Sequence, residues 1–263
     1  MPVRLMQTAR IKEIVQDTKN IKTFRLDMDM PARPGQFAMV WVPGMDEKPI
    51  SVSYLGEPLG FTVLKKGATT TKMHNMKVGD LLGVRGPLGR GFKITGEKLV
   101  VIGGGVGMAP LSPLVEVAID KGKEVTVIIG SLTECEVLFH DRLEKAGAEV
   151  LVCTDDGTCG FKGFCTEMYK EVLGKKSFDA CYTCGPEIMM MKVLQLSKQY
   201  NIPTQVSMER YFKCGIGICG QCAVDDSGLR VCKEGPTFRD VEVENIKDFG
   251  KYFRDASGKK IYW

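Results

Sequence analysis

Four cysteines near the end of the printed chain follow the spacing C-x4-C-x2-C-x9-C. They are Cys214, Cys219, Cys222 and Cys232, and glycines are interspersed among the first three. This spacing is typical of plant-type ferredoxins, in which four thiolates hold a [2Fe–2S] cluster. Structural zinc sites usually pair their ligands in two short knuckles, and only one such pair occurs here. Zinc ligation and unligated core thiols stay as alternatives, but the spacing favours a centre that moves electrons.

The composition is that of a globular protein large enough for two domains. The chain has 263 residues, of which 44% are hydrophobic and 26% charged. A net charge of +4 without a concentrated basic run gives no indication of nucleic-acid binding. No run approaches the roughly 18 apolar residues that span a bilayer, and the first residues lack the apolar core of a secretory signal. The ten cysteines therefore indicate reduced thiols and a cytoplasmic protein.

The pattern along the chain changes twice. Short apolar or alternating runs separated by turn signals in residues 1–96 predict a small antiparallel β-barrel or sandwich. Strands alternating with helical stretches in residues 97–209 predict a parallel sheet covered by helices on both faces. Residues 210–263 are expected to form an appended cysteine module with a hairpin over residues 223–231.

The individual elements follow from these periodicities. Strands of the first part are expected at residues 21–28, 36–42, 50–54, 60–65 and 81–85. Strands of the second part are expected at residues 99–102, 124–129, 149–154, 179–182 and 204–208. A helical stretch is expected after residues 103–110, and further helices near 134–146, 164–173 and 187–200.

Two glycine-containing turns lie where predicted parallel strands end. Residues 103–110 have the sequence Gly-Gly-Gly-Val-Gly-Met-Ala-Pro, and Cys-Gly-Pro occupies a second strand-to-helix junction. Missing side chains let a pyrophosphate approach the backbone, and the following helix supplies oriented N–H donors. Tight turns that bind nothing give the same pattern, so the glycines alone do not decide. The residues expected around a nucleotide are Gly103, Gly104, Gly105, Gly107, Pro110, Cys184, Gly185 and Pro186.

Three stretches of the first part have the chemistry of an anion site. The first, Lys48, Pro49, Ile50 and Ser51, places a cation beside a hydroxyl. The second, residues 66–71, is a Gly/Thr run whose N–H and O–H groups could cradle phosphate. The third, residues 86–92, is a rigid glycine-rich turn. Each stretch alone is more often a plain turn.

Together and in this order, the motifs resemble the ferredoxin-NADP reductase superfamily along nearly the whole chain. Within it, the stretches K-P-I-S, G-P-L-G-R-G-F, G-G-G-V-G-M-A-P, C-G-P-E-I-M-M and the cysteine run are most similar to electron-transfer subunits of heteromeric, NAD-dependent dihydroorotate dehydrogenases. The resemblance implies an FAD-binding barrel over residues 1–96, an NAD-binding domain over 97–209 and a [2Fe–2S] module over 210–263. It implies the cofactors FAD, NAD(H) and the cluster.

The resemblance also assigns roles to residues of the barrel. Lys48 replaces the usual arginine near the FAD pyrophosphate and offers a point charge where arginine offers a fork. Ile50 falls where a side chain packs on the isoalloxazine ring, and Ser51 where one bonds near its N5. The second phosphate segment covers Lys66, Gly67, Thr69, Thr70 and Thr71. No catalytic side chain is expected, because the cofactors carry the chemistry, although Cys184 is expected near the nicotinamide.

The resemblance further implies a partner, since nothing in this chain supplies a site for dihydroorotate. The implied partner is an FMN-containing catalytic subunit in a heterotetramer, docked around residues 211–221 and active in pyrimidine biosynthesis. Alternatives are the small subunit of another flavin and iron–sulfur complex, such as a bifurcating ferredoxin:NAD(P) oxidoreductase, sulfide dehydrogenase or cytosolic hydrogenase, and a zinc-filled redox sensor. The absence of an arginine in residues 130–134 favours NAD(H) over NADP(H).

Overall fold

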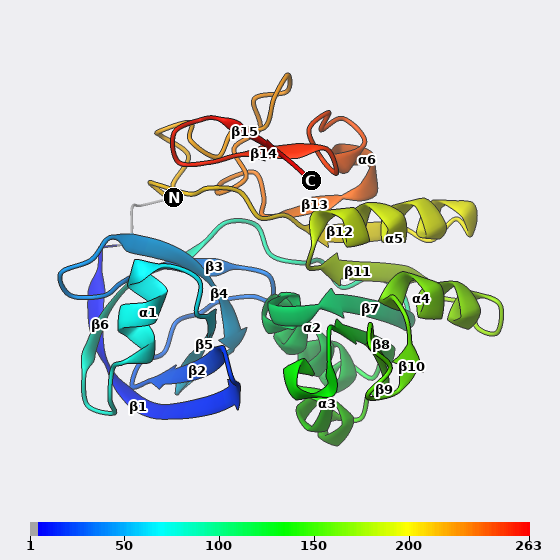
Figure 1. Ribbon diagram of the computed structural model, residues 1–263, viewed down its shortest axis with the longest axis horizontal. Coiled ribbons are helices and arrows are strands. Elements are labelled where there is room, and N and C mark those ends of the chain that lie inside the picture. Colours follow the sequence, from blue (N-terminus) through cyan, green and yellow to red (C-terminus); the bar gives the residue numbers. More distant parts are fainter. Residues whose placement is uncertain (1–4) are drawn as a thin grey trace.

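A computed structural model describes residues 5–263, which form three parts packed against one another (Figure 1). The first part is a closed antiparallel barrel with the strand order β1-β2-β5-β4-β3-β6, which confirms the predicted barrel. Its elements are β1 (Gln7–Thr18), β2 (Ile21–Leu26), β3 (Phe37–Trp41), β4 (Glu47–Tyr54), β5 (Leu59–Leu64), α1 (Ala68–His74) and β6 (Leu81–Leu88). Alternate residues such as Phe24 and Phe61 fill its interior.

Two elements of the barrel were not predicted. Strand β1 was missed because most of its side chains are exposed and few of them are apolar, so its alternation is weak. Helix α1 was missed because three consecutive threonines, which are poor helix formers, occupy its first turns. Tertiary packing overrides that preference: Thr69 and Met73 of α1 are buried against the barrel.

The second part is a seven-stranded sheet with the order β10-β9-β8-β7-β11-β12-β13. All neighbours are parallel except β12 and β13, which are antiparallel. Its strands are β7 (Lys98–Gly104), β8 (Glu124–Ser131), β9 (Glu149–Thr154), β10 (Phe161–Lys162), β11 (Ala180–Cys184), β12 (Thr204–Ser207) and β13 (Thr237–Arg239). Its helices are α2 (Met108–Asp120), α3 (His140–Ala146), α4 (Cys165–Leu173) and α5 (Glu187–Gln199), with short 3-10 turns at Gly105–Gly107 and Glu134–Glu136.

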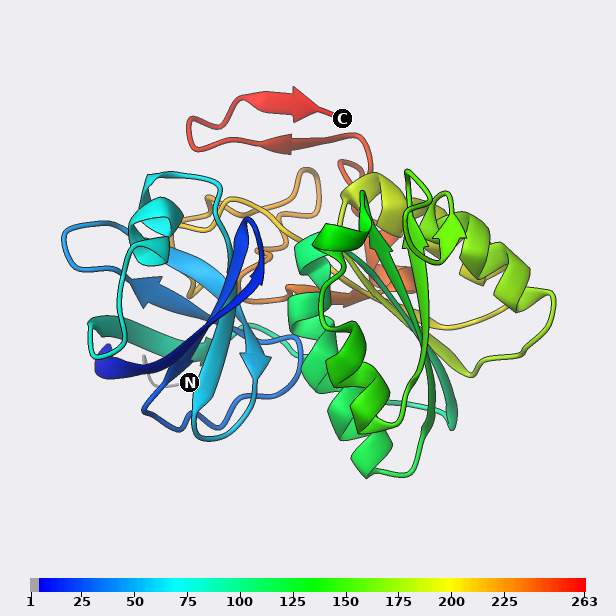
Figure 2. The ribbon, with the colours of Figure 1, turned by 60° about the horizontal axis from the view of Figure 1, so that its bottom comes forward.

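Helices cover both faces of this sheet, as the sequence predicted (Figure 2). Leu99 and Val101 of β7 pack with α2 and α3 on one face, whereas Val100 and Ile102 pack with α4 and α5 on the other. Near-continuous apolar strands fit a sheet buried on both sides. Helix α2 lies on the side of the sheet that faces the barrel, and it contacts β4.

The cysteine module lies across the top of both other parts in Figure 1. It contains the irregular segment 208–236, α6 (Asp240–Val243) and a terminal hairpin of β14 (Tyr252–Arg254) and β15 (Lys260–Tyr262). The predicted hairpin over residues 223–231 is reduced to one antiparallel bridge between Ala223 and Arg230. A third apolar core joins the module to Phe37 and Met39 of the barrel and to Val206 of the sheet. In residues 5–263, no helix combines the length and apolarity needed to cross a membrane.

Candidate functional site

The parallel sheet reverses its winding direction between β7 and β11. From β7 the chain proceeds to β8 on one side, whereas β11 returns to the other side of β7. The two strands are in register, with Gly103 opposite Cys184 at their carboxyl ends. In open α/β sheets such a switch point is where the strand ends form a ligand crevice. The two predicted nucleotide turns are therefore neighbours at the place where a nucleotide binds in this class of fold.

The glycines of these turns serve different purposes. A Cβ on Gly107 would lie 2.3 Å from the carbonyl oxygen of Cys184, and one on Gly104 would lie 2.8 Å from Pro186 Cδ. These two glycines are therefore required for contact between the turns. Gly105 has a φ of +53° and open space on its Cβ side, so an approaching anion can reach its backbone.

Cys184 lies at the end of β11, beside the glycine-rich turn. Burial raises the pKa of its thiol to about 12, so the thiol stays protonated at neutral pH. A neutral thiol is a poor nucleophile. The residue therefore places an uncharged thiol beside the glycine-rich turn.

The K-P-I-S motif lies on β4, where Lys48, Ile50 and Ser51 are all half-buried. Among the described residues, Lys48 Nζ has neither a hydrogen bond nor an ion pair, so its charge is available to an anion. The Gly/Thr run behaves differently. Thr70 Oγ1 accepts the N–H groups of Lys66 (2.9 Å) and Gly67 (3.0 Å), so these two donors stabilise the turn before α1.

The four cysteines lie on one irregular loop. Burial raises the pKa of Cys214, but N–H groups of Cys219, Ile216 and Ile218 outweigh it and lower the pKa to about 6. Two of these donors, on Ile218 and Cys219, are 3.4 and 3.5 Å from Cys214 Sγ. Such N–H donors favour the thiolate, which is the form that binds metal.

The second pair, Cys222 and Cys232, is linked through the sulfur of Cys222. A side-chain hydrogen bond from Cys232 lowers the pKa of Cys222 to about 7, and the same contact raises the pKa of Cys232. The Cys232 amide lies 3.4 Å from Cys222 Sγ. Within residues 5–263, no three ligand-type side chains converge as for a single metal ion. Two thiol pairs suit a two-iron cluster, because each iron takes two of the four thiolates.

Glycines give the cysteine loop its curvature. Gly215, Gly217 and Gly220 have φ values of +71°, +78° and +70°, a region that other residues rarely adopt. The loop is exposed at one edge, where Cys219 is exposed and Ile218 is 78% accessible, whereas Cys222 and Cys232 are buried. The cysteine loop therefore has one side toward the protein interior and one toward solvent.

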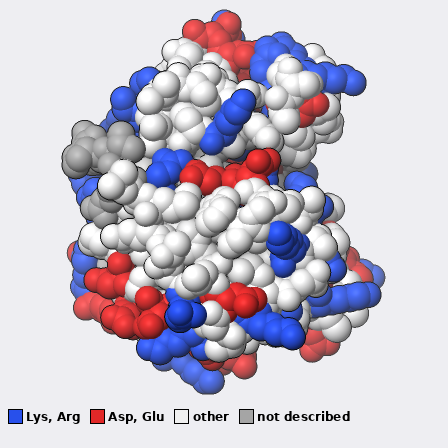
Figure 3. Space-filling model, turned by 90° about the vertical axis from the view of Figure 1, so that its left-hand side faces the viewer, with Lys and Arg blue, Asp and Glu red and all other residues white. Residues whose placement is uncertain are grey.

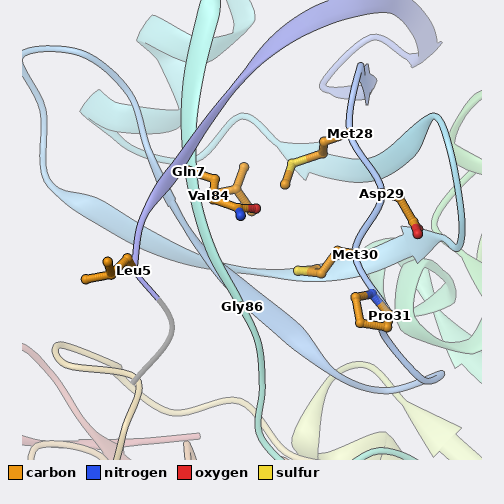
Figure 4. Close-up of a pocket in the computed structure, with 8 residues that line it drawn as sticks. All are labelled: Leu5, Gln7, Met28, Asp29, Met30, Pro31, Val84 and Gly86. Carbon is orange, nitrogen blue, oxygen red and sulfur yellow. The ribbon is translucent and has the colours of Figure 1, made fainter. Parts of the chain in front are cut away.

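A pocket of about 410 Å³ lies elsewhere, at an end of the barrel (Figure 4). Met28, Met30 and Val84 give it an apolar lining beside the polar groups of Gln7 and Asp29. Gly86 of the glycine-rich turn 86–92 lines it, but none of the residues predicted to hold the FAD phosphates, the nucleotide or the cluster does. The pocket therefore adjoins the predicted motifs only at Gly86.

Comparisons with known proteins agree with this geometry. Residues 209–244 match the model for the iron–sulfur cluster binding domain of dihydroorotate dehydrogenase B, and residues 101–195 match an oxidoreductase NAD-binding domain. A protein of Methanocaldococcus jannaschii named "Probable dihydroorotate dehydrogenase B (NAD(+)), electron transfer subunit" is 54% identical over 254 residues, 97% of each chain. The chain belongs to this family of electron transfer subunits. A relative of the same name from Methanothermobacter thermautotrophicus is 44% identical and covers 98% of the chain, which covers 97% of the relative.

Solved structures extend the likeness to the fold of the family. An NADH-dependent reduced ferredoxin-NADP oxidoreductase, described for flavin-based electron bifurcation, has a TM-score of 0.81 and 29% identity, with 89% of this chain and 88% of that one covered. The ferredoxin reductase of carbazole 1,9a-dioxygenase has a TM-score of 0.67 at 22% identity, with 77% and 67% covered. The predicted family, oxidoreductase class and reductase-like architecture are confirmed.

Several residues of the site had no signal in the sequence. Arg85 of β6 contacts the cysteine loop, and Arg210 contacts Glu187 at the start of α5. Arg142 of α3 joins the nucleotide domain to the barrel through the Ser53 carbonyl (2.9 Å). Glu187 directly follows the Cys-Gly-Pro turn, which was the one available hint. The others are joined to their partners by contacts distant in sequence, which local periodicity does not encode.

Proposed function

We propose that this chain carries electrons between NAD(H), FAD and a [2Fe–2S] cluster, and exchanges them with the FMN of a separate dihydroorotate dehydrogenase catalytic subunit. The names of the relatives and the iron–sulfur and NAD-binding domain matches support this proposal. FAD, when bound, converts between hydride and single-electron transfer, and the cluster relays single electrons. In this role the chain is part of pyrimidine biosynthesis.

The observation that carries the proposal is where the cysteine loop lies. Met39 of β3 pairs with Pro49 of the K-P-I-S motif. A Cβ on Gly215 would lie 2.8 Å from Met39 Cγ, so the loop rests directly on this strand. One strand therefore separates the proposed flavin motif from the cysteines.

The chain's own residues have binding and orienting roles. The unpaired Lys48 ammonium would hold the FAD pyrophosphate as a point charge, with Pro49, Ile50 and Ser51 along the flavin ring. Thr71 and the segment before α1 would contact the second phosphate region. The residues at the β7–β11 switch point would hold NAD(H), with the neutral Cys184 near the nicotinamide. Cys214, Cys219, Cys222 and Cys232 would hold the cluster as two pairs.

The partner would dock at the exposed edge of the cysteine loop. Tyr211 and Ile218 expose apolar surface there, with 38% and 78% of each residue accessible. Figure 3 shows a broad area of uncharged side chains on the barrel side of the molecule, bordered by charges of both signs. We propose a heterotetramer, in the reducing cytoplasm that thiolate ligands favour.

Co-expression with the catalytic subunit, followed by size-exclusion chromatography, tests the proposal. We expect a complex with the visible absorbance of flavin and iron–sulfur, and loss of that complex on Ile218→Asp. Val241→Asp is the matched control, because Val241 is exposed in the same module but lies on α6. A monomer under all conditions, or a colourless protein after anaerobic reconstitution, would contradict the proposal.

A second candidate is the small subunit of a flavin-based bifurcating oxidoreductase. The observation in its favour is the TM-score of 0.81 to the bifurcating structure. The 54% identity to dihydroorotate dehydrogenase B relatives favours the first proposal. Mild purification from the native source and identification of the co-purifying large subunit separate the two.

A further inference from the structure

One arginine of the barrel connects the proposed flavin strand with the proposed cluster loop. Arg85 on β6 places Nη2 2.5 Å from Glu47 Oε2 and 3.0 Å from the carbonyl oxygen of Cys214. Glu47 is the first residue of β4 and directly precedes Lys48. A single guanidinium therefore bridges the start of the K-P-I-S strand and the first cysteine of the loop.

The strand register places these groups in one row. Met39 of β3 pairs with Pro49 on one side and with Arg85 on the other. Directly paired residues project to the same face of a sheet, so all three lie on the barrel surface that the cysteine module covers. Met39 is fully buried there, under Gly215 of the loop. The cysteine loop therefore rests on a surface formed by Met39, Pro49 and Arg85, of which Arg85 is the charged residue.

Arg85 and its ion-pair partner Glu47 act on the redox equilibrium of the cluster with opposite signs. A cluster becomes more negative when it is reduced, so a nearby cation stabilises the reduced form and a nearby anion the oxidised form. The Arg85 side chain is only 14% exposed, and Glu47 is 27% exposed, so solvent screens Arg85 less.

We propose that Arg85 is a positioning residue that fixes the Cys214 segment against the flavin strand and raises the reduction potential of the cluster. The proposal rests on the FAD and cluster of the proposed function and is independent of the partner. Charge and bridging are separate contributions. Both contacts are made by Nη2 of the guanidinium, and a lysine side chain keeps the charge but is shorter and does not place its nitrogen at that point.

The test is an EPR-monitored redox titration of the full chain loaded with FAD and cluster. For Arg85→Met we expect the reduction equilibrium to shift about tenfold toward the oxidised form, which is about 59 mV for a one-electron couple. For Glu47→Gln we expect a smaller shift of opposite sign. Lys247→Met is the control for loss of an exposed cation, since Lys247 lies in the cysteine module itself, is 74% exposed and pairs with Asp226; its midpoint should equal that of the wild type.

Arg85→Lys separates positioning from charge. We expect the equilibrium constant for reduction of the cluster to stay within about twofold of the wild-type value. We also expect faster amide hydrogen exchange in residues 214–219. That exchange can also be measured if Arg85→Met incorporates too little iron for titration.

An unchanged midpoint in Arg85→Met, or shifts of the same sign in Arg85→Met and Glu47→Gln, would overturn the charge role. Unchanged exchange in Arg85→Lys would overturn the positioning role. Either result would leave the proposed function intact. A wild-type chain without any cluster signal after reconstitution would instead contradict the proposed function itself.

Discussion

The cysteine module is attached to the rest of the molecule by two contrasting ion-pair sites. Toward the nucleotide domain, Arg210 contacts Glu187 and Asp248, and all three side chains are at most 6% exposed. Toward the barrel, Arg90 pairs with Glu242 of the module, and Arg85, which pairs with Glu47 inside the barrel, donates to the Cys214 carbonyl; the exposures of these four charged side chains lie between 14% and 41%. The first site is shielded from solvent and contains two carboxylates for one guanidinium. The second site is partly exposed to solvent, and each of its arginines has one carboxylate partner.

The contrast indicates a division of roles. Buried ions are costly when a partner is lost, so the Arg210 site holds its neighbours in one arrangement. Glu187 also accepts the Gly250 amide at 2.7 Å, which connects the Cys-Gly-Pro turn to the chain's final segment. Partly exposed pairs contribute little to stability but still set local charge. The contacts with the nucleotide domain therefore hold the cysteine module in place, and the contacts with the barrel set the charge around the cysteine loop.

Removal of the buried guanidinium should have the largest effect. Arg210→Met leaves Glu187 and Asp248 buried without a cation, and we expect a loss of about 3–5 kcal/mol in the free energy of unfolding. Urea unfolding at neutral pH measures it. Arg239→Met is the matched control, since that arginine is 66% exposed and pairs with Glu242 at 3.4 Å, and it should cost less than about 1 kcal/mol. Equal losses would abolish the distinction between the two sites.

A methyl group at the barrel contact should have an intermediate effect. Gly215→Ala combines a φ of +71° with a Cβ only 2.8 Å from Met39 Cγ, and we expect a cost of about 1–3 kcal/mol. Gly220→Ala is the control, because Gly220 has a φ of +70° and open space around its Cβ position. The difference between the two variants in lost free energy of unfolding, measured with urea, reports the contact of the Gly215 position with the barrel. The absence of an excess would show that the loop does not rest firmly on β3.

The smallest effect concerns pH and the Arg90–Glu242 pair. The hydrogen bond from Arg90 lowers the pKa of Glu242 from 4.5 to about 2. A lowered pKa stabilises the folded state above pH 4.5, and this contribution disappears as the pH falls toward 2. Glu242→Gln should therefore be less stable than wild type at pH 7, by up to about 1 kcal/mol.

The measurement is urea unfolding of both proteins at pH 7 and pH 2. We expect the difference between them to vanish at the lower pH, where the thiolates are protonated in both proteins alike. Glu124→Gln is the control, because Glu124 is 77% exposed and lies 4.0 Å from its lysine partner. A difference that stays constant with pH would exclude an electrostatic origin.

Local pattern was sufficient for most of the fold. Strand β9 has the predicted bounds of residues 149–154, and α4 and α5 begin and end within one residue of prediction. The helix predicted over residues 134–146 was wrong in its first half, where Leu138 is fully buried and Phe139 has a φ of +67°. An apolar run that enters the core in extended form interrupts the helix there, and helical periodicity does not distinguish the two cases.

The site was only partly predictable, for a related reason. Cysteine spacing and glycine-rich turns are local signals, because metal and phosphate contacts require particular residues at short intervals. Arg85 and Cys214 are 129 residues apart, and Arg210 and Glu187 are joined across different elements. Such pairs follow from how the three parts pack. Only the structure shows which of the many arginines meets which carboxylate.

The antiparallel pairing of β12 with β13 has a consequence for how this family can diversify. Ser207 and Thr237 are cross-strand neighbours, and the Met208 amide donates to the Pro236 carbonyl at 2.9 Å. Residues 208–236 thus leave the sheet after β12 and return to it at the adjacent position of β13, so that they form an inserted cassette between two paired strands. Evolution or engineering could exchange that cassette for one with another metal or potential while the underlying scaffold keeps its connectivity.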